Sequence, residues 1–127
     1  MNRNLPNWRS LLYVPASEER FVAKAHERGA DAIILDLEDG VAPDAKARAR
    51  AGLTAAAASA RRNGADIVVR INRPLRMAAE DIAAAATAGA DGVICTKMMG
   101  ADHVRLLSEL AAESELAAGR EIGSLRF

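Results

Sequence analysis

Three carboxylates follow an apolar run early in the sequence. Residues 32–35 read Ala-Ile-Ile-Leu, and Asp36, Glu38 and Asp39 come directly after them. An apolar run that ends in charged residues is typical of a buried strand with polar side chains at its carboxyl end. In an extended strand Asp36 and Glu38 share one face. We expect at least one of these acids to hold a cation through water or to orient a basic group. The alternative is a solvated loop in which Asp39 caps a turn.

Arg70 and Asn72 form a second polar pair, two residues apart at the end of the apolar run 67–69. On an extended strand they too would share a face. A guanidinium beside apolar residues needs an anionic partner, because an unpaired buried charge is costly. That partner is either a substrate carboxylate or phosphate, held by two parallel hydrogen bonds, or Glu38 in a structural ion pair. Both can hold at once.

Five further side chains have two interpretations each. Lys97 ends a third apolar run and is interpreted as a structural or ligand-orienting amine, with a Schiff-base lysine as the minor alternative. Tyr13 either lines the site or packs. Arg20 and Lys24 are placed to meet a phosphate, although a solvated helix face is the commoner explanation. Cys95 is interpreted as a core residue rather than a nucleophile.

A repeated tripeptide indicates how these residues are positioned. Gly-Ala-Asp occurs at 29–31, 64–66 and 89–91, each time after a predicted helix and before an apolar run that ends in polar residues. Strands that alternate with helices at this spacing predict a parallel sheet. Because ligand sites of parallel α/β folds lie at the carboxyl ends of the strands, the polar clusters should converge.

The predicted domain occupies residues 9–127, after a loose N-terminal arm at residues 1–8. We predict strands at 9–15, 31–36, 67–72 and 92–95, the start of a fifth strand within 122–127, and helices from the N-cap Ser17 to Gly29 and at 45–63, 79–88 and 102–117. An open doubly wound sheet, such as a small flavodoxin-like domain, and part of a (β/α)8 barrel both fit. The absence of Gly-x-Gly-x-x-Gly after the first strand counts against a dinucleotide fold.

Composition narrows the class of partner. The 17 basic and 17 acidic residues balance, and no basic stripe with interleaved aromatics occurs, so we expect no nucleic acid partner. No apolar stretch approaches the roughly 18 residues of a membrane span, and no signal peptide is evident. A single cysteine fits a reducing cytoplasm. A cytoplasmic protein with a small-molecule substrate is the expectation.

The chain resembles the HpcH/HpaI aldolase/citrate lyase family, in its citrate lyase beta-subunit-like (CoA-ester lyase) branch. The matching stretches occur in the family's order and are 9–15 (Arg-Ser-Leu-Leu-Tyr-Val-Pro), 31–39 (Asp-Ala-Ile-Ile-Leu-Asp-Leu-Glu-Asp), 42–46 (Ala-Pro-Asp-Ala-Lys), 69–72 (Val-Arg-Ile-Asn) and 96–97 (Thr-Lys). The resemblance implies a TIM barrel of the phosphoenolpyruvate/pyruvate superfamily. It also implies Mg²⁺-dependent carbon–carbon cleavage beside a carbonyl, often on a CoA thioester, through an enolate.

Residue roles follow from this resemblance. Arg70 matches the substrate-binding and catalytic arginine, and Glu38, Asp39 and Asn72 are expected to support substrate binding. Glu38 and Asp39 would lie near the Mg²⁺ without touching it. Tyr13 and Lys24 match positions that contact CoA in some members, and Arg20 is grouped with them as a phosphate contact. Full-length relatives are expected to be homo-oligomers, as trimers or hexamers.

Three departures from the family pattern qualify these expectations. Ala16 replaces a usual glycine, and Thr96 replaces a usual proline. The direct metal ligands are expected beyond Phe127. A complete barrel needs about 200–250 residues, so this chain would supply about half and is expected to be an inactive fragment by itself. The alternative is a non-catalytic half-barrel module for binding or assembly that keeps an anion site at Arg70.

Overall fold

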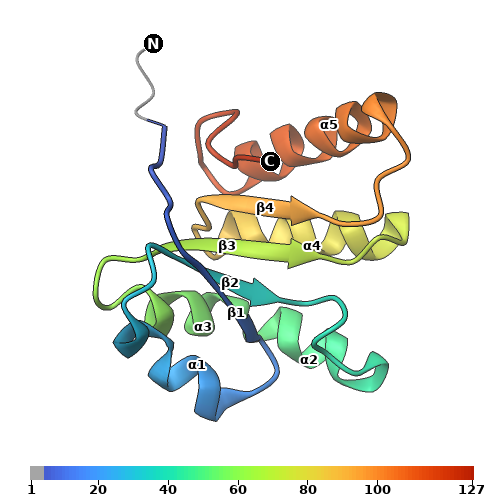
Figure 1. The fold of residues 1–127 in the computed structure, drawn as a ribbon. Coiled ribbons are helices and arrows are strands. Elements are labelled where there is room, and N and C mark those ends of the chain that lie inside the picture. Colours follow the sequence, from blue (N-terminus) through green and yellow to red (C-terminus); the bar gives the residue numbers. More distant parts are fainter. Residues whose placement is uncertain (1–4) are drawn as a thin grey trace.

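The computed structural model describes residues 5–127, so the first four residues of the predicted arm lie outside the described residues. Strands and helices alternate along the chain (Figure 1). Their bounds are β1 (Leu11–Pro15), α1 (Glu19–Ala25), β2 (Ala32–Asp36), α2 (Lys46–Ala51), α3 (Leu53–Ala60), β3 (Asp66–Ile71), α4 (Leu75–Thr87), β4 (Gly92–Cys95) and α5 (Ala101–Ala117), with 3₁₀ turns at His26–Arg28 and Pro43–Ala45. No helix in this part of the chain has the length and apolar character needed to cross a bilayer.

The four strands form one parallel sheet in the order β1-β2-β3-β4. This confirms the predicted parallel α/β architecture, and Figure 1 shows all four arrows running the same way. Each strand is added beside the previous one without the reversal of order that defines a doubly wound sheet. The register aligns Pro15, Asp36, Arg70 and Ile94 in one row across the sheet. The carboxyl ends of the strands therefore lie at the same edge of the sheet, as the predicted convergence of the polar clusters requires.

The two faces of the sheet have different surroundings. Alternate residues such as Ile33, Leu35 and Val69 belong to the main core, which includes buried residues of α1 to α5. The other face has a small cluster of Ala32, Ile34 and Val68, packed with Trp8 and Ile94. Trp8 Nε1 donates a hydrogen bond to Asp66 Oδ2 at 2.7 Å. The end of the predicted arm is thus held against the face that lacks helices.

Several helix boundaries differ from the predictions, and three of the differences have a clear physical reason. Ser17 is not an N-cap: the amide of Glu18 bonds to the Pro15 carbonyl at 3.1 Å, and this turn delays the helix to Glu19. The predicted helix at 45–63 is divided at Gly52, whose φ of −86° and ψ of 2° interrupt it. Glycine has low helix propensity, so a break there costs little. The helix predicted from 79 begins four residues earlier, directly after Pro74.

The predicted fifth strand is present only as one parallel bridge between Gly92 and Arg126. The amide of Val93 donates to the Arg126 carbonyl at 2.7 Å. Glu115, a buried residue of α5, fixes this segment by accepting hydrogen bonds from the amides of Gly123 and Leu125, both at 2.6 Å. A buried carboxylate on α5 therefore places residues 123–126 along β4.

Replacing Glu115 should detach this segment. Glu115→Ala leaves two amides without their acceptor, so we expect a loss of about 2–4 kcal/mol in the free energy of unfolding. Faster hydrogen exchange at the Val93 amide should accompany it. Glu113→Ala, at an exposed position on the same helix, should change stability by less than about 0.5 kcal/mol. Equal effects of the two variants in urea unfolding would contradict this role.

Candidate active site

An ion pair between Asp36 and Arg70 forms the centre of the candidate site. The parallel register sets the two residues side by side on β2 and β3. Arg70 Nε donates to Asp36 Oδ1 at 2.8 Å, and Nη2 donates to Oδ2 at 2.6 Å. Two parallel bonds fix the plane of the guanidinium as well as its position. The structural partner expected from the sequence was Glu38, but its Oε1 lies 3.8 Å from Arg70 Nη1. Asp36 is the principal partner.

Asp36 also organises the loop that follows β2. Its Oδ1 accepts the amide of Glu38 at 2.8 Å, and its Oδ2 accepts the amide of Gly40 at 2.7 Å. Burial acts to raise the pKa of Asp36, but the hydrogen bonds from Arg70 and the two amides outweigh it and hold this pKa below its usual value. Asp36 is therefore ionised at neutral pH. The close approach at Gly40 leaves no room for a Cβ, which would meet Asp36 Oδ2.

The guanidinium of Arg70 keeps one edge available for a ligand. Asp36 uses Nε and one N–H of Nη2, so three of the five N–H groups are not used by this pair. The ring of Tyr13 lies against the guanidinium, 4.8 Å from Cζ to the ring centroid. Hydrogen bonding to Asp36 raises the pKa of Arg70 despite burial, so the side chain stays cationic. A fixed cation of this kind can bind a carboxylate or a developing enolate oxygen.

Lys97, just after β4, reaches the second carboxylate of the site. Its Nζ donates to Glu38 Oε2 at 2.6 Å and lies 3.4 Å from Asp39 Oδ1. The Glu38 side chain is 7% exposed, whereas that of Asp39 is 72% exposed. Hydrogen bonding to Glu38 raises the pKa of Lys97. A Schiff-base lysine needs a lowered pKa, so this observation argues against that alternative.

Asn72 points into the helix layer and does not share the face of Arg70, because β3 ends at Ile71. Its Nδ2 donates to the Leu37 carbonyl at 2.9 Å and to Asp81 Oδ2 at 2.8 Å. The expectation of a shared face was therefore wrong. Asn72 supports the loop that contains Glu38, and its role in substrate binding stays a prediction.

Sequence reasoning missed two side chains that support this loop. Asp81, a fully buried residue of α4, accepts bonds from Asn72 and from Arg50 Nε, the latter at 2.7 Å. Lys46 donates to the carbonyls of Leu37 and Glu38, at 2.9 and 2.6 Å. Lys46 lies in a family-like stretch, which was a usable signal. Asp81 sits in an Ala-rich helix and gives none.

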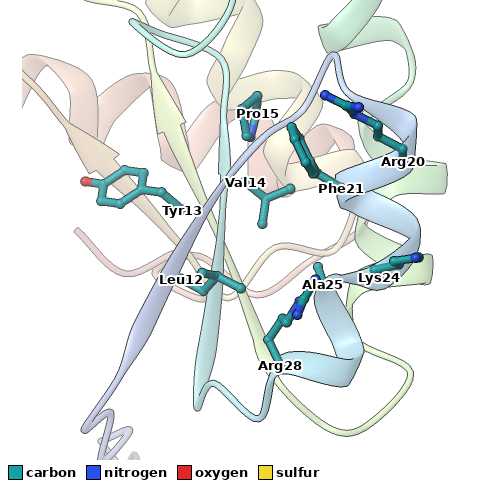
Figure 2. A pocket seen from close by; sticks show the side chains of 9 residues that line it. All are labelled: Leu12, Tyr13, Val14, Pro15, Arg20, Phe21, Lys24, Ala25 and Arg28. Atoms are coloured by element: carbon teal, nitrogen blue, oxygen red, sulfur yellow. The ribbon is translucent and has the colours of Figure 1, made fainter.

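The predicted CoA-contacting residues line one pocket of about 510 Å³ between β1 and α1. In Figure 2, Leu12 and Val14 point toward α1, while Tyr13 points to the other side of β1. Arg20, Lys24 and Arg28 come from the helix side of the pocket, with Lys24 directed outward. Tyr13, Arg20 and Lys24 all border this pocket, although the Tyr13 ring and the Lys24 amine point away from it. Their role in binding a cofactor stays a prediction.

The carboxylates at this edge do not fit a direct Mg²⁺ shell. Asp36 is occupied by Arg70 and two amides, and Glu38 by Lys97. Across residues 5–127, no group of three or more His, Cys, Asp or Glu side chains is arranged to hold a metal ion. The group here with a clear chemical capacity is the cationic Arg70, which can bind an anion and stabilise negative charge.

Fold and site together define a parallel α/β protein with an arginine-centred site at the carboxyl edge of its sheet. The chain belongs to the HpcH/HpaI aldolase/citrate lyase family, whose sequence model matches residues 9–127. It is 37% identical over 115 residues to a (3S)-malyl-CoA thioesterase of Cereibacter sphaeroides, covering 90% of this chain and 40% of that protein.

Citrate lyase beta subunits are also similar to this chain. The subunit of Haemophilus influenzae is 33% identical over 121 residues, covering 94% of this chain and 41% of the relative. That of Leuconostoc mesenteroides is 32% identical over 117 residues, covering 91% and 39%. The chain thus spans about 40% of the length of these relatives.

Gly40→Ala should disturb the site directly. The added Cβ displaces the Asp36 carboxylate, so the bidentate pair with Arg70 should weaken and stability should fall by about 1–3 kcal/mol. Gly52→Ala is the matched control, because its Cβ would make only ordinary contacts and it joins two helices. That variant should be neutral or stabilising by about 1 kcal/mol. Thermal unfolding and the NMR signal of Arg70 Nε–H check both; an unchanged Gly40→Ala protein would contradict the argument.

Cys95 should react slowly with alkylating agents. Burial raises the pKa of its thiol to about 11. Because the thiolate is the reactive form, labelling should accelerate about tenfold per pH unit from pH 8 and level off only near pH 11. Iodoacetamide rates measured over short times, against free cysteine, test this. A rate at pH 8 equal to that of free cysteine would show an accessible, ordinary thiol.

Proposed function

We propose that this chain forms the substrate-binding part of a carbon–carbon lyase that acts on a 2-oxo or 3-hydroxy acid or its CoA thioester. The observation that carries the proposal is the guanidinium of Arg70, fixed by Asp36 with one N–H edge open at the carboxyl end of the sheet. Parallel α/β enzymes bind their substrates at this end. Membership of the aldolase/citrate lyase family supports the reaction class.

Arg70 would act on the charge that develops during cleavage. Breaking a carbon–carbon bond beside a carbonyl leaves an enolate, whose oxygen becomes negative. A cation that is already oriented stabilises this oxygen without reorganising at the moment of reaction. Arg70 is cationic and held by Asp36 and Tyr13 before any ligand arrives. Magnesium belongs to the proposal for longer family members, where further residues would supply its ligands.

The pocket beside β1 would accept the CoA portion of a thioester. Apolar side chains line the pocket, together with three cations: Arg20 and Lys24 on α1, and Arg28 on the 3₁₀ turn that follows it. This combination suits a pantetheine chain that ends in phosphates. Tyr13 is one of the lining residues, but its ring lies on the other side of β1, against Arg70, so β1 would separate the CoA side from the acid side.

The sheet is proposed to be part of a (β/α)8 barrel. Sequential strand order, helices packed on one face, and the Arg126 bridge beside β4 support this. The face with Ala32, Ile34 and Val68 would then be the barrel interior. Small and branched side chains are what such an interior contains.

Calorimetric binding of (3S)-malyl-CoA to the 127-residue chain tests the role of Arg70. Arg70→Lys keeps the charge but loses the bidentate fork, so the Kd should rise at least about tenfold. Arg105→Lys, an exposed arginine on α5, should leave the Kd within about twofold. The same Kd in all three proteins would overturn the proposal.

Competing ligands and product analysis separate the alternatives. Free malate binding as tightly as malyl-CoA would favour the non-catalytic binding module. With Mg²⁺ added we expect no turnover by this chain alone. Formation of free CoA and malate would indicate thioester hydrolysis, the activity in the name of the Cereibacter relative. Acetyl-CoA and glyoxylate would confirm the lyase but contradict the expectation that this chain alone has no turnover.

A further inference from the structure

Lys97 has a backbone conformation that side-chain-bearing residues rarely adopt. Its φ is 53°, and every other positive-φ residue within residues 5–127 is a glycine. The preceding Thr96 has a buried Oγ1 without a hydrogen-bond partner. Unfavourable local geometry of this kind persists where surrounding contacts hold it, and it gathers at functional sites. The turn after β4 thus directs Lys97 at some local cost.

The side chain of Lys97 extends along the carboxyl edge of the sheet, from the end of β4 toward the end of β2. Lys97 follows β4, whereas Glu38 follows β2, and β3 with Arg70 lies between them. The amine nevertheless reaches Glu38 Oε2 at 2.6 Å. Its side chain is 57% exposed, so the ion pair forms at the open rim of the site. Glu38 itself is almost fully buried.

Glu38 therefore lies between two cations, Lys97 and Arg70, and is hydrogen-bonded to only one of them. Oε2 is bonded to Lys97, while Oε1 is 3.8 Å from Arg70 Nη1, beyond hydrogen-bond length. A buried carboxylate that loses its cation is strongly destabilised and takes the nearest replacement. Without Lys97 that replacement is Nη1 of Arg70. Nη1 belongs to the edge that Asp36 leaves open.

We propose that Lys97 is a positioning residue that neutralises Glu38 and so keeps the outer edge of Arg70 open for an anionic substrate. The assignment rests on the proposed function for the identity of the anion. The arrangement of the side chains can be tested without any ligand. Lys97 acts through Glu38 and Arg70, and its own contact with the substrate is not required.

Two variants separate the amine from the backbone. Lys97→Met removes the amine and keeps the unfavourable φ. Lys97→Gly also removes the amine, but glycine adopts a φ of 53° without strain, so this variant should fold at least as well as the parent. Both should bind malyl-CoA about tenfold more weakly, the effect of one lost charge-assisted interaction. Lys97→Arg should retain most of the binding.

Replacing Lys97 in a protein that already carries Glu38→Gln tests whether Lys97 acts through Glu38. If Lys97 works by neutralising Glu38, replacing Lys97 in the Glu38→Gln protein should change the Kd by less than about twofold. A tenfold loss that persists in this background would make Lys97 a direct substrate contact and overturn the proposal. Unchanged binding in both Lys97→Met and Lys97→Gly would overturn it as well.

The NMR signal of Arg70 Nε–H in the free protein keeps this test distinct from that of the proposed function. We expect the signal to shift in Lys97→Met and Lys97→Gly, and to be insensitive to Lys97 in the Glu38→Gln background. If this NMR pattern is seen but malyl-CoA does not bind, the positioning role of Lys97 is supported and the proposed function fails. A signal that Lys97 never moves would reject the positioning role whatever the ligand result.

Discussion

The bidentate pair between Asp36 and Arg70 is the interaction on which the rest of the site depends. It joins β2 and β3 in the row where the register sets Asp36 opposite Arg70. A partly buried ion pair contributes little net stability, because desolvation offsets much of the attraction. Its value here is geometric. Both carboxylate oxygens of Asp36 accept hydrogen bonds from Arg70 and from a backbone amide of the loop after β2. The guanidinium and this loop are therefore fixed together.

Side chains of the helix layer hold the loop that follows Asp36. Asp81 on α4 holds Asn72 and Arg50, and Asn72 in turn holds the Leu37 carbonyl. Lys46 binds the same stretch of backbone from α2. Each of these polar groups is satisfied by a partner, which is what makes a buried network rigid rather than costly. The loop with Glu38 is therefore held on both sides.

Charge at the sheet edge is balanced by pairs that differ in exposure. Asp36 and Arg70 form the inner pair, and Glu38 and Lys97 form the outer one, closer to solvent. Asp39 remains exposed at the rim. In this arrangement Arg70 stays cationic, and three of its five N–H groups are not used by Asp36. An anionic ligand at this edge would meet a site that is already organised.

Residue types and their order determined much of this protein. Alternating apolar runs and Gly-Ala-Asp repeats predicted a parallel sheet, and the rule for carboxyl ends predicted that Asp36, Glu38, Arg70 and Lys97 would meet. Which acid pairs with which cation depends on strand register, and register is a tertiary property. Sequence reasoning offered a substrate anion, Glu38 or both as partners of Arg70, whereas the register placed Asp36 beside it.

Tertiary structure alone also decided where Asn72 points and what Asp81 and Glu115 do. The face alternation that predicts side-chain direction ends with the strand, so Asn72, one residue past β3, turns to α4. Buried carboxylates on helices have no local signal, because their partners are backbone amides and side chains distant in the chain. Sequence fixes which groups need partners, since that follows from residue chemistry. Only packing decides which partners they find, since that depends on distances between elements.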